Sequence, residues 1–129
     1  MPLVLYYIPD PKKEQQLAAL CRGLGFRAKR LVPGDANKTV GTLAGLKTAA
    51  SADKAPAGWT LPELLIFSEM TGDALDLFLA AYKNAGIAPV ALKAIVTPHN
   101  TAWSLYALAE ELKKERAAML LYRKNQTTS

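Results

Sequence analysis

The fold is indicated most clearly by the stretch Lys93-Ala94-Ile95-Val96-Thr97-Pro98-His99-Asn100-Thr101-Ala102-Trp103-Ser104. Its apolar first half is typical of a buried strand, Pro98 ends that strand, and the polar residues after it are typical of a turn into a helix. The stretch holds the only histidine and one of the two tryptophans of the chain. Because ligands of α/β proteins bind at such strand-to-helix turns, it predicts both an α/β fold and the place of any site.

Three further strands are predicted upstream of this one. Apolar runs at 3–8 and 63–68 are typical of strands covered on both faces, and 90–97 is the fourth strand. The charged run 26–32 is typical of a strand at the edge of a sheet.

A helix is expected after each strand. Asp10 and Thr71 are suited to cap the first and third helices, and Asn37 the weak second one. Asn100 or Thr101 is expected to cap the long last helix.

This alternation predicts a single α/β domain over residues 1–129. We expect a four-stranded, mostly parallel sheet of order 2-1-3-4, a shortened flavodoxin-like arrangement with helices on both faces. The segment 49–62 is expected to be a flexible loop and 125–129 a frayed tail. No internal sequence repeat is evident.

Composition restricts the classes of protein that fit the chain. Half of its 129 residues are hydrophobic, which is enough for a core without metal or disulfide support, and Cys21 is the only cysteine. A lone cysteine predicts a cytoplasmic location. No apolar run approaches a membrane span or a signal peptide, so no membrane association is expected.

The net charge of +5 is compatible with nucleic-acid binding. Basic residues are nevertheless scattered, and the densest group is Arg22, Arg27, Lys29 and Arg30. Because no recognition motif accompanies them, a solvated basic surface is the simpler interpretation, and a nucleic-acid partner is not expected.

The candidate site residues follow the ends of the predicted strands. In a parallel sheet, these ends would meet at one end of the sheet. The candidates are Asp10, Ser68, Glu69, Lys93, Thr97, His99, Asn100 and Trp103.

Most of these residues also have a structural interpretation. Asp10 before Pro11 is typical of a helix cap, and Lys93 on an edge strand guards against aggregation. His99 is a lone histidine without metal-ligand spacing around it, and Trp103 either stacks on a ligand or packs as core. No phosphate-binding loop, dinucleotide fingerprint or nucleophile elbow occurs. We therefore assign no catalytic residue, metal or cofactor.

The segment 64–112 resembles a family of bacterial proteins catalogued as domain of unknown function 3783. Its strongest block is 92–105, where the family pattern of Lys, Thr, Asn and Trp is present as Lys93, Thr97, Asn100 and Trp103. A leucine-rich acidic helix with Glu110, Glu111 and Leu112 follows. The family carries no established activity, so the resemblance implies a fold and no mechanism.

Three functions remain open at this point. The first is a small non-catalytic binding or regulatory module, with a protein or small molecule as its partner. The second is a small enzyme or ligand-binding domain that uses Asp10, Glu69, His99 and Asn100. The third is a nucleic-acid accessory protein that uses the basic segment 22–30. Apolar residues 119–122, beyond the last core position, also predict a homodimer through the C-terminal helix.

Overall fold

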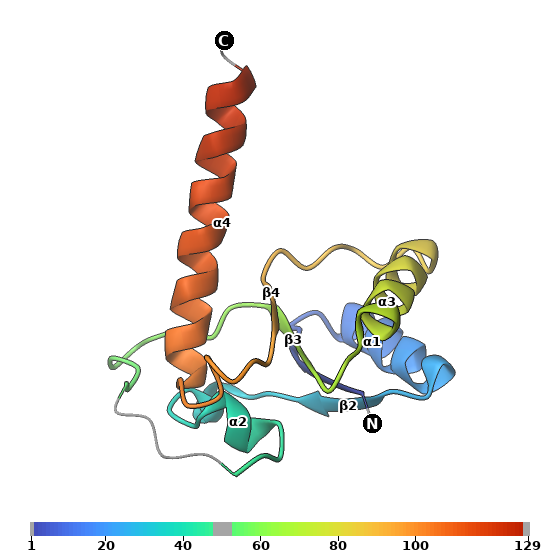
Figure 1. Cartoon of the computed structure of the whole chain (residues 1–129), viewed down its shortest axis with the longest axis horizontal. Helices are drawn as coiled ribbons and strands as arrows, with labels where there is room; N and C mark the ends of the chain where they lie inside the picture. The colour runs from blue at the N-terminus through green and yellow to red at the C-terminus, as the bar shows by residue number, and fades with distance from the viewer. Residues whose placement is uncertain (1, 48–52, 128–129) are drawn as a thin grey trace.

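Two β-α-β units supply the four strands of the sheet (Figure 1). The computed structural model describes residues 2–47 and 53–127. The first unit consists of β1 (Leu3–Tyr7), α1 (Pro11–Leu24) and β2 (Arg27–Arg30), followed by the 3-10 turn η1 (Pro33–Asp35) and α2 (Val40–Leu43). The second consists of β3 (Leu64–Ser68), α3 (Gly72–Asn84) and β4 (Lys93–Ile95), followed by α4 (Leu105–Thr127).

The strand order is β2-β1-β3-β4, as the sequence predicts. The outer pairs β1–β2 and β3–β4 are parallel, whereas the central pair β1–β3 is antiparallel, with Leu3 opposite Ser68 and Tyr7 opposite Leu64. The sheet is thus mostly parallel, but its two halves run in opposite directions. The carboxyl ends of β1 and β2 therefore lie at one end of the sheet, and those of β3 and β4 at the other.

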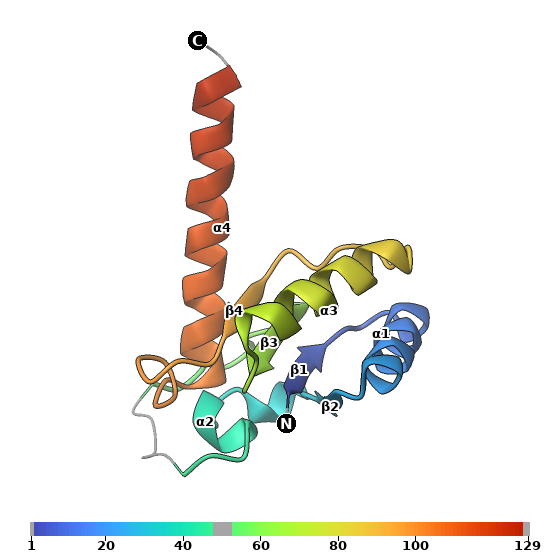
Figure 2. The same ribbon diagram turned by 45° about the vertical axis from the view of Figure 1, so that its right-hand side comes forward.

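Helices cover both faces of the sheet, which confirms the predicted layers (Figure 2). Successive residues of β3 point to opposite faces. Leu65 and Phe67 therefore pack with Leu17 of α1 and Phe78 of α3. Burying each such side chain contributes about 1.5–3 kcal/mol.

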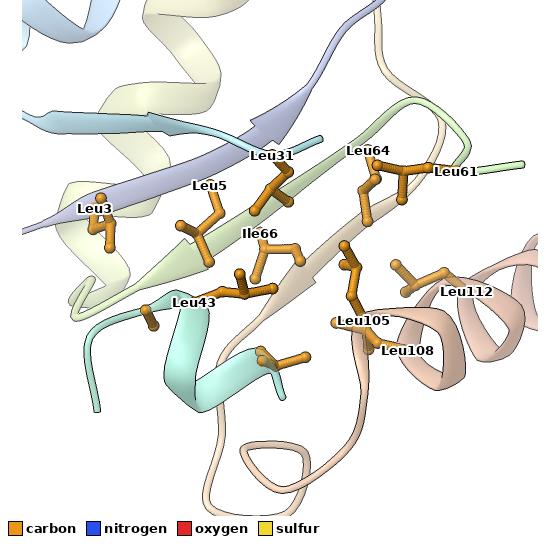
Figure 3. Close-up of a cluster of buried hydrophobic side chains, with 12 residues drawn as sticks. Leu3, Leu5, Leu31, Leu43, Leu61, Leu64, Ile66, Leu105, Leu108 and Leu112 are labelled. Carbon is orange, nitrogen blue, oxygen red and sulfur yellow. The ribbon is translucent and has the colours of Figure 1, made fainter. Parts of the chain in front are cut away.

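The opposite face of the sheet is covered by α2 and the first turns of α4. Leu64 and Ile66 of β3 pack there with Leu43 of α2 and with Leu105 and Leu108 of α4 (Figure 3). Leu112 is the last buried residue of α4 among those whose side chains are described. The helix continues beyond it, away from the sheet (Figure 1).

Several predicted boundaries are confirmed and others shift. Asp10 and Thr71 cap α1 and α3, and Gly25 ends α1 in the left-handed conformation. The cap of α2 is Thr39 rather than Asn37. β4 contains only 93–95 of the predicted 90–97, and each residue of β2 is exposed, as expected of an edge strand.

The predicted loop and tail are described only in part. Residues 53–62 form no helix or strand, and 49–52 lie outside the described residues. Trp59, which lies within 53–62, packs against the core cluster that contains Leu105. Residues 125–127 continue α4, and 128–129 lie outside the described residues.

The two β-α-β units share local contacts that the sequence analysis missed. Leu31 follows β2 and donates its N–H to Tyr6 (2.7 Å), and Val96 follows β4 and donates its N–H to Phe67 (2.8 Å). Gly86, like Gly25, has a positive φ just after its helix. Each edge strand is thus joined to its neighbour in the same way.

The turns after the two edge strands also match. The N–H of Val32 donates to Asp35 Oδ2 (3.0 Å), and the N–H of Thr97 donates to Asn100 Oδ1 (2.9 Å). Pro33 and Pro98 occupy the same place in the two turns.

The two halves join through reciprocal backbone hydrogen bonds. The N–H of Val40 donates to Trp103 O (2.8 Å), and the N–H of Leu105 donates to Lys38 O (2.9 Å). Two further bonds form a second such pair: the N–H of Gly41 donates to Thr101 O, and the N–H of Tyr106 donates to Ala36 O. The chain therefore consists of two similar units related by an approximate two-fold axis, although no sequence repeat is evident.

Candidate functional site

A groove of about 500 Å³ runs along the open side of β4. Leu75 and Leu79 of α3 form one wall, and Leu108 and Leu112 of α4 form the other. Five of the eight candidate residues also line it: Lys93, Thr97, His99, Asn100 and Trp103. The structure therefore gathers the candidates of the strand-to-helix turn around one apolar groove.

The other three candidates do not line this groove. Asp10 lies at the opposite end of the sheet, because β1 is antiparallel to β3. Its Oδ1 accepts the N–H of Lys12 (3.1 Å), so its helix-capping role is confirmed. Ser68 is buried at the end of β3, and Glu69 is an exposed residue with φ 56°. The expected meeting of all strand ends is wrong, since that expectation requires parallel central strands.

Asn100 ties the turn to the end of β4. Its Oδ1 accepts the N–H of Thr97, and its Nδ2 donates to the carbonyl of Ile95 (3.0 Å). The backbone N–H of Asn100 donates to Thr97 Oγ1 (3.3 Å) in return. The side chain of Asn100, a residue with 8% of its surface exposed, thus satisfies two part-buried backbone groups of the strand end.

The cap of α4 is Ser104, not Asn100 or Thr101 as the sequence suggests. Ser104 Oγ accepts the N–H of Ala107 at 3.0 Å. The fully buried Ser104 forms an isolated bridge with Thr39, the cap of α2. The helix begins later than predicted because 97–103 form a separate folded turn.

His99 and Trp103 are the polar and aromatic groups at the mouth of the groove. Their rings meet edge to face at a centroid distance of 5.2 Å. Lys93 extends along β4, and its Nζ donates to the carbonyl of Val90 (3.1 Å). Two smaller hollows also touch Lys93, which therefore stands where the concave surfaces beside β4 meet.

Leu79 is a wall residue that is not among the candidates named from the sequence, because its spacing with Leu75, Phe78 and Tyr82 fits a helical stripe that faces a core. It belongs to the apolar stripe of α3, yet 39% of its surface is exposed. The periodic stripe was the available signal, but it does not reveal that this part of α3 extends past the sheet.

A second polar cluster stands on α4 away from the groove mouth. Glu110 accepts hydrogen bonds from Lys113 Nζ (2.6 Å) and from Trp59 Nε1 (3.3 Å). The bond from Lys113 is the main reason that the pKa of Glu110 lies below its ordinary value. Trp59 also meets the ring of Tyr106 edge to face. No sequence pattern predicts this cluster, because Trp59 lies in an irregular segment.

The remaining nucleophile and metal-ligand candidates are not poised for chemistry. Burial raises the pKa of Cys21 to about 11, so its thiol is protonated at neutral pH. Within residues 2–47 and 53–127, no group of three His, Cys, Asp or Glu side chains is placed to hold a metal ion. Over the same residues, no helix is both long and apolar enough to cross a membrane.

The basic segment 22–30 lies at the edge of the sheet opposite to the groove, because β2 and β4 are the two edge strands. Lys29 Nζ donates to the carbonyl of Leu43 (3.0 Å), and Arg30 Nε lies 3.8 Å from Glu14. Lys29 and Arg30 belong to the edge strand β2, as expected, and both contact other groups of the chain.

The fold and the groove define an α/β domain with an apolar hollow beside an open edge strand. Residues 58–119 match the model of a family described as Domain of unknown function (DUF3783). This match confirms the resemblance of 64–112 and covers β3, α3, β4 and α4 as far as Met119. No curated protein and no solved structure matches the chain.

Proposed function

We propose that this chain is a small cytoplasmic, non-catalytic binding module that holds an apolar segment of a protein partner in the groove beside β4. The observation that carries the proposal is the pairing of two apolar helix walls, α3 and α4, on either side of a strand with an open edge. Exposed apolar surface of this kind marks interaction sites on folded domains.

The polar residues of the groove support binding rather than catalysis. Asn100 uses its side-chain amide to hold the backbone of Thr97 and Ile95, and the ammonium of Lys93 is bonded to Val90. His99, Trp103, Glu111 and Glu115 also line the groove. An apolar floor with a few polar groups around it is typical of a recognition surface.

The enzyme alternative loses its central argument in this geometry. It required Asp10 near His99 and Asn100, but Asp10 follows β1 at the other end of the sheet. The nucleic-acid alternative has basic residues along β2, but no aromatic platform accompanies them there. We therefore favour a protein partner.

A selection from a phage-displayed library of short random peptides tests this function. We expect the protein to enrich peptides rich in apolar residues, and Leu79→Asp to abolish their binding because it charges a wall of the groove. Leu77→Asp is the matched control, since Leu77 is more exposed on the same helix but does not line the groove. Failure to enrich any peptide, or equal binding by Leu79→Asp, would contradict the proposal.

We also propose that the chain forms a homodimer through α4. This helix has 23 residues, a length of about 34 Å at 1.5 Å per residue. Beyond Leu112, its exposed residues include Met119, Leu120, Leu121 and Tyr122. Pairing of two such segments would remove this apolar surface from water.

Analytical sedimentation tests the dimer. We expect the chain to sediment as a dimer at high micromolar concentration, and the double variant Leu120→Glu, Leu121→Glu to sediment as a monomer. A wild-type chain that is monomeric at that concentration contradicts the dimer. Leu77→Asp serves as a control for a charge on another exposed apolar position.

A further inference from the structure

The approximate two-fold relation gives β2 and β4 equivalent places at the two edges of the sheet. Each is the second strand of a β-α-β unit, and each leads into a turn that begins with a proline. Any difference between the two edges therefore reflects their side chains rather than their position in the fold.

The β2 edge carries features that block the addition of another strand. All four residues of β2 are exposed, and three of them are cationic: Arg27, Lys29 and Arg30. Glu14 of α1 stands beside this strand, where it lies within reach of Arg30 and accepts a bond from Tyr6 Oη. Charged edges of this kind prevent pairing with other chains.

The β4 edge differs at the corresponding positions. Leu75 on α3 takes the place that Glu14 has on α1, and Ile95 on β4 takes that of Arg30 on β2, as the shared contacts of Tyr6 and Phe67 indicate. Ile95 remains 45% exposed. One edge strand therefore carries three cationic residues, whereas its counterpart carries one, Lys93, and an exposed isoleucine.

The backbone of β4 also has unused hydrogen-bonding groups on this side. Leu92 O and Val96 N bond to β3, so in the alternating parallel ladder the N–H and C=O groups of Lys93 and Ile95 point away from β3. The carbonyl of Ile95 is taken by Asn100 Nδ2. The groups directed into the groove are thus the N–H and C=O of Lys93 and the N–H of Ile95.

From these observations we infer that β4 accepts an extended apolar peptide as a fifth strand of the sheet. This inference rests on the proposed function and specifies how the groove is used. Successive side chains of an added strand point to opposite faces. One set would contact Leu75, Leu79 and Ile95, and the other would contact Leu108 and Leu112.

Asn100 limits the length of the added strand. Because its amide occupies the carbonyl of Ile95, the ladder between β4 and the peptide ends at the N–H of Ile95. The side chains of Trp103 and His99 stand at that end of the groove. The added strand is therefore short, and its apolar side chains contribute much of the affinity.

An N-methyl scan of a peptide enriched on the protein tests this mode of binding. Methylation removes one amide hydrogen at a time. We expect a loss of binding of at least tenfold at one peptide position, that of the N–H that bonds to the carbonyl of Lys93, because Asn100 already occupies the carbonyl of Ile95. The neighbouring positions should show little loss. The same scan on the Leu77→Asp variant is the control and should give the same pattern.

Each outcome of the scan decides a different claim. Binding that tolerates methylation at every position, or loses affinity equally at adjacent positions, contradicts strand addition and leaves the groove as a binding site for another conformation, such as a helix. If no peptide is enriched at all, both the proposed function and this inference are wrong.

Discussion

Thr39 and Ser104 pair in an isolated antiparallel bridge, and each caps the helix that follows it. Both are buried at the contact between the two units of the chain. Two similar units thus meet through equivalent caps, which orients α4 relative to β4 and thereby places one wall of the groove.

Replacement of Ser104 by alanine should destabilise the protein by about 1 kcal/mol, because the N–H of Ala107 loses its capping acceptor. Thr101→Ala is the control, since Thr101 caps no helix here, and its cost should be within about 0.5 kcal/mol of zero. Urea unfolding of the two variants measures both values. A larger loss for Thr101→Ala would contradict the assignment of the cap.

Asn100→Ala should cost about 1–3 kcal/mol, because the N–H of Thr97 and the carbonyl of Ile95 would both lose a partner in a part-buried turn. Asn100→Asp keeps the acceptor for Thr97 but loses the donor for Ile95, so an intermediate cost is expected. Thermal unfolding of the three proteins orders them. Equal stability of Asn100→Ala and the wild type would show that the turn does not depend on this side chain.

Proline substitutions test which backbone groups of β4 face the open edge. Ala94→Pro removes an N–H that bonds to β3, whereas Ile95→Pro removes one that points into the groove. We expect Ala94→Pro to cost at least about 1 kcal/mol more than Ile95→Pro, the typical net value of one hydrogen bond. Denaturant unfolding provides the comparison, and the reverse order would mean that the alternation of the ladder is assigned wrongly.

The contact between Trp59 and Glu110 should respond to acid. The folded pKa of Glu110 is lowered, chiefly by the bond from Lys113, so this contact is complete above the ordinary glutamate pKa and is lost as the pH falls through the lowered value. Trp59 fluorescence in a Trp103→Phe background follows the transition. Lys113→Met should move its midpoint to higher pH, and an unchanged midpoint would exclude Lys113 as the cause.

The sequence predicts the central strands well because their residues are apolar on both faces. The runs 3–8 and 63–68 leave few alternatives to buried strands, and the caps Asp10 and Thr71 mark the helices that follow. The direction of β3 relative to β1 could not be predicted. It is set by the long connection from β2 to β3, whose described residues form the 3-10 turn η1 and the four-residue helix α2.

The candidate site was predicted only in part, because the positions of some candidates depend on the direction of β3 relative to β1. The turn residues 97–103 are adjacent in sequence, so their proximity follows from the turn itself, whereas Asp10 depended on the direction of a strand. Leu79 was missed because its spacing fits a core stripe and its exposure depends on where the sheet ends. The structural similarity of the two units could not be predicted from the sequence, because they share residue roles, such as those of Leu31 and Val96, more than identities.

Backbone amide exchange with a phage-selected peptide bound tests whether an extended segment binds along the open edge of β4. We expect the exchange of the Lys93 and Ile95 amides to slow at least tenfold, while the exchange of the Ala28 and Arg30 amides on the equivalent edge of β2 remains unchanged. Slower exchange at Ala28 and Arg30, or none at Lys93 and Ile95 despite saturating peptide, would contradict this mode of binding.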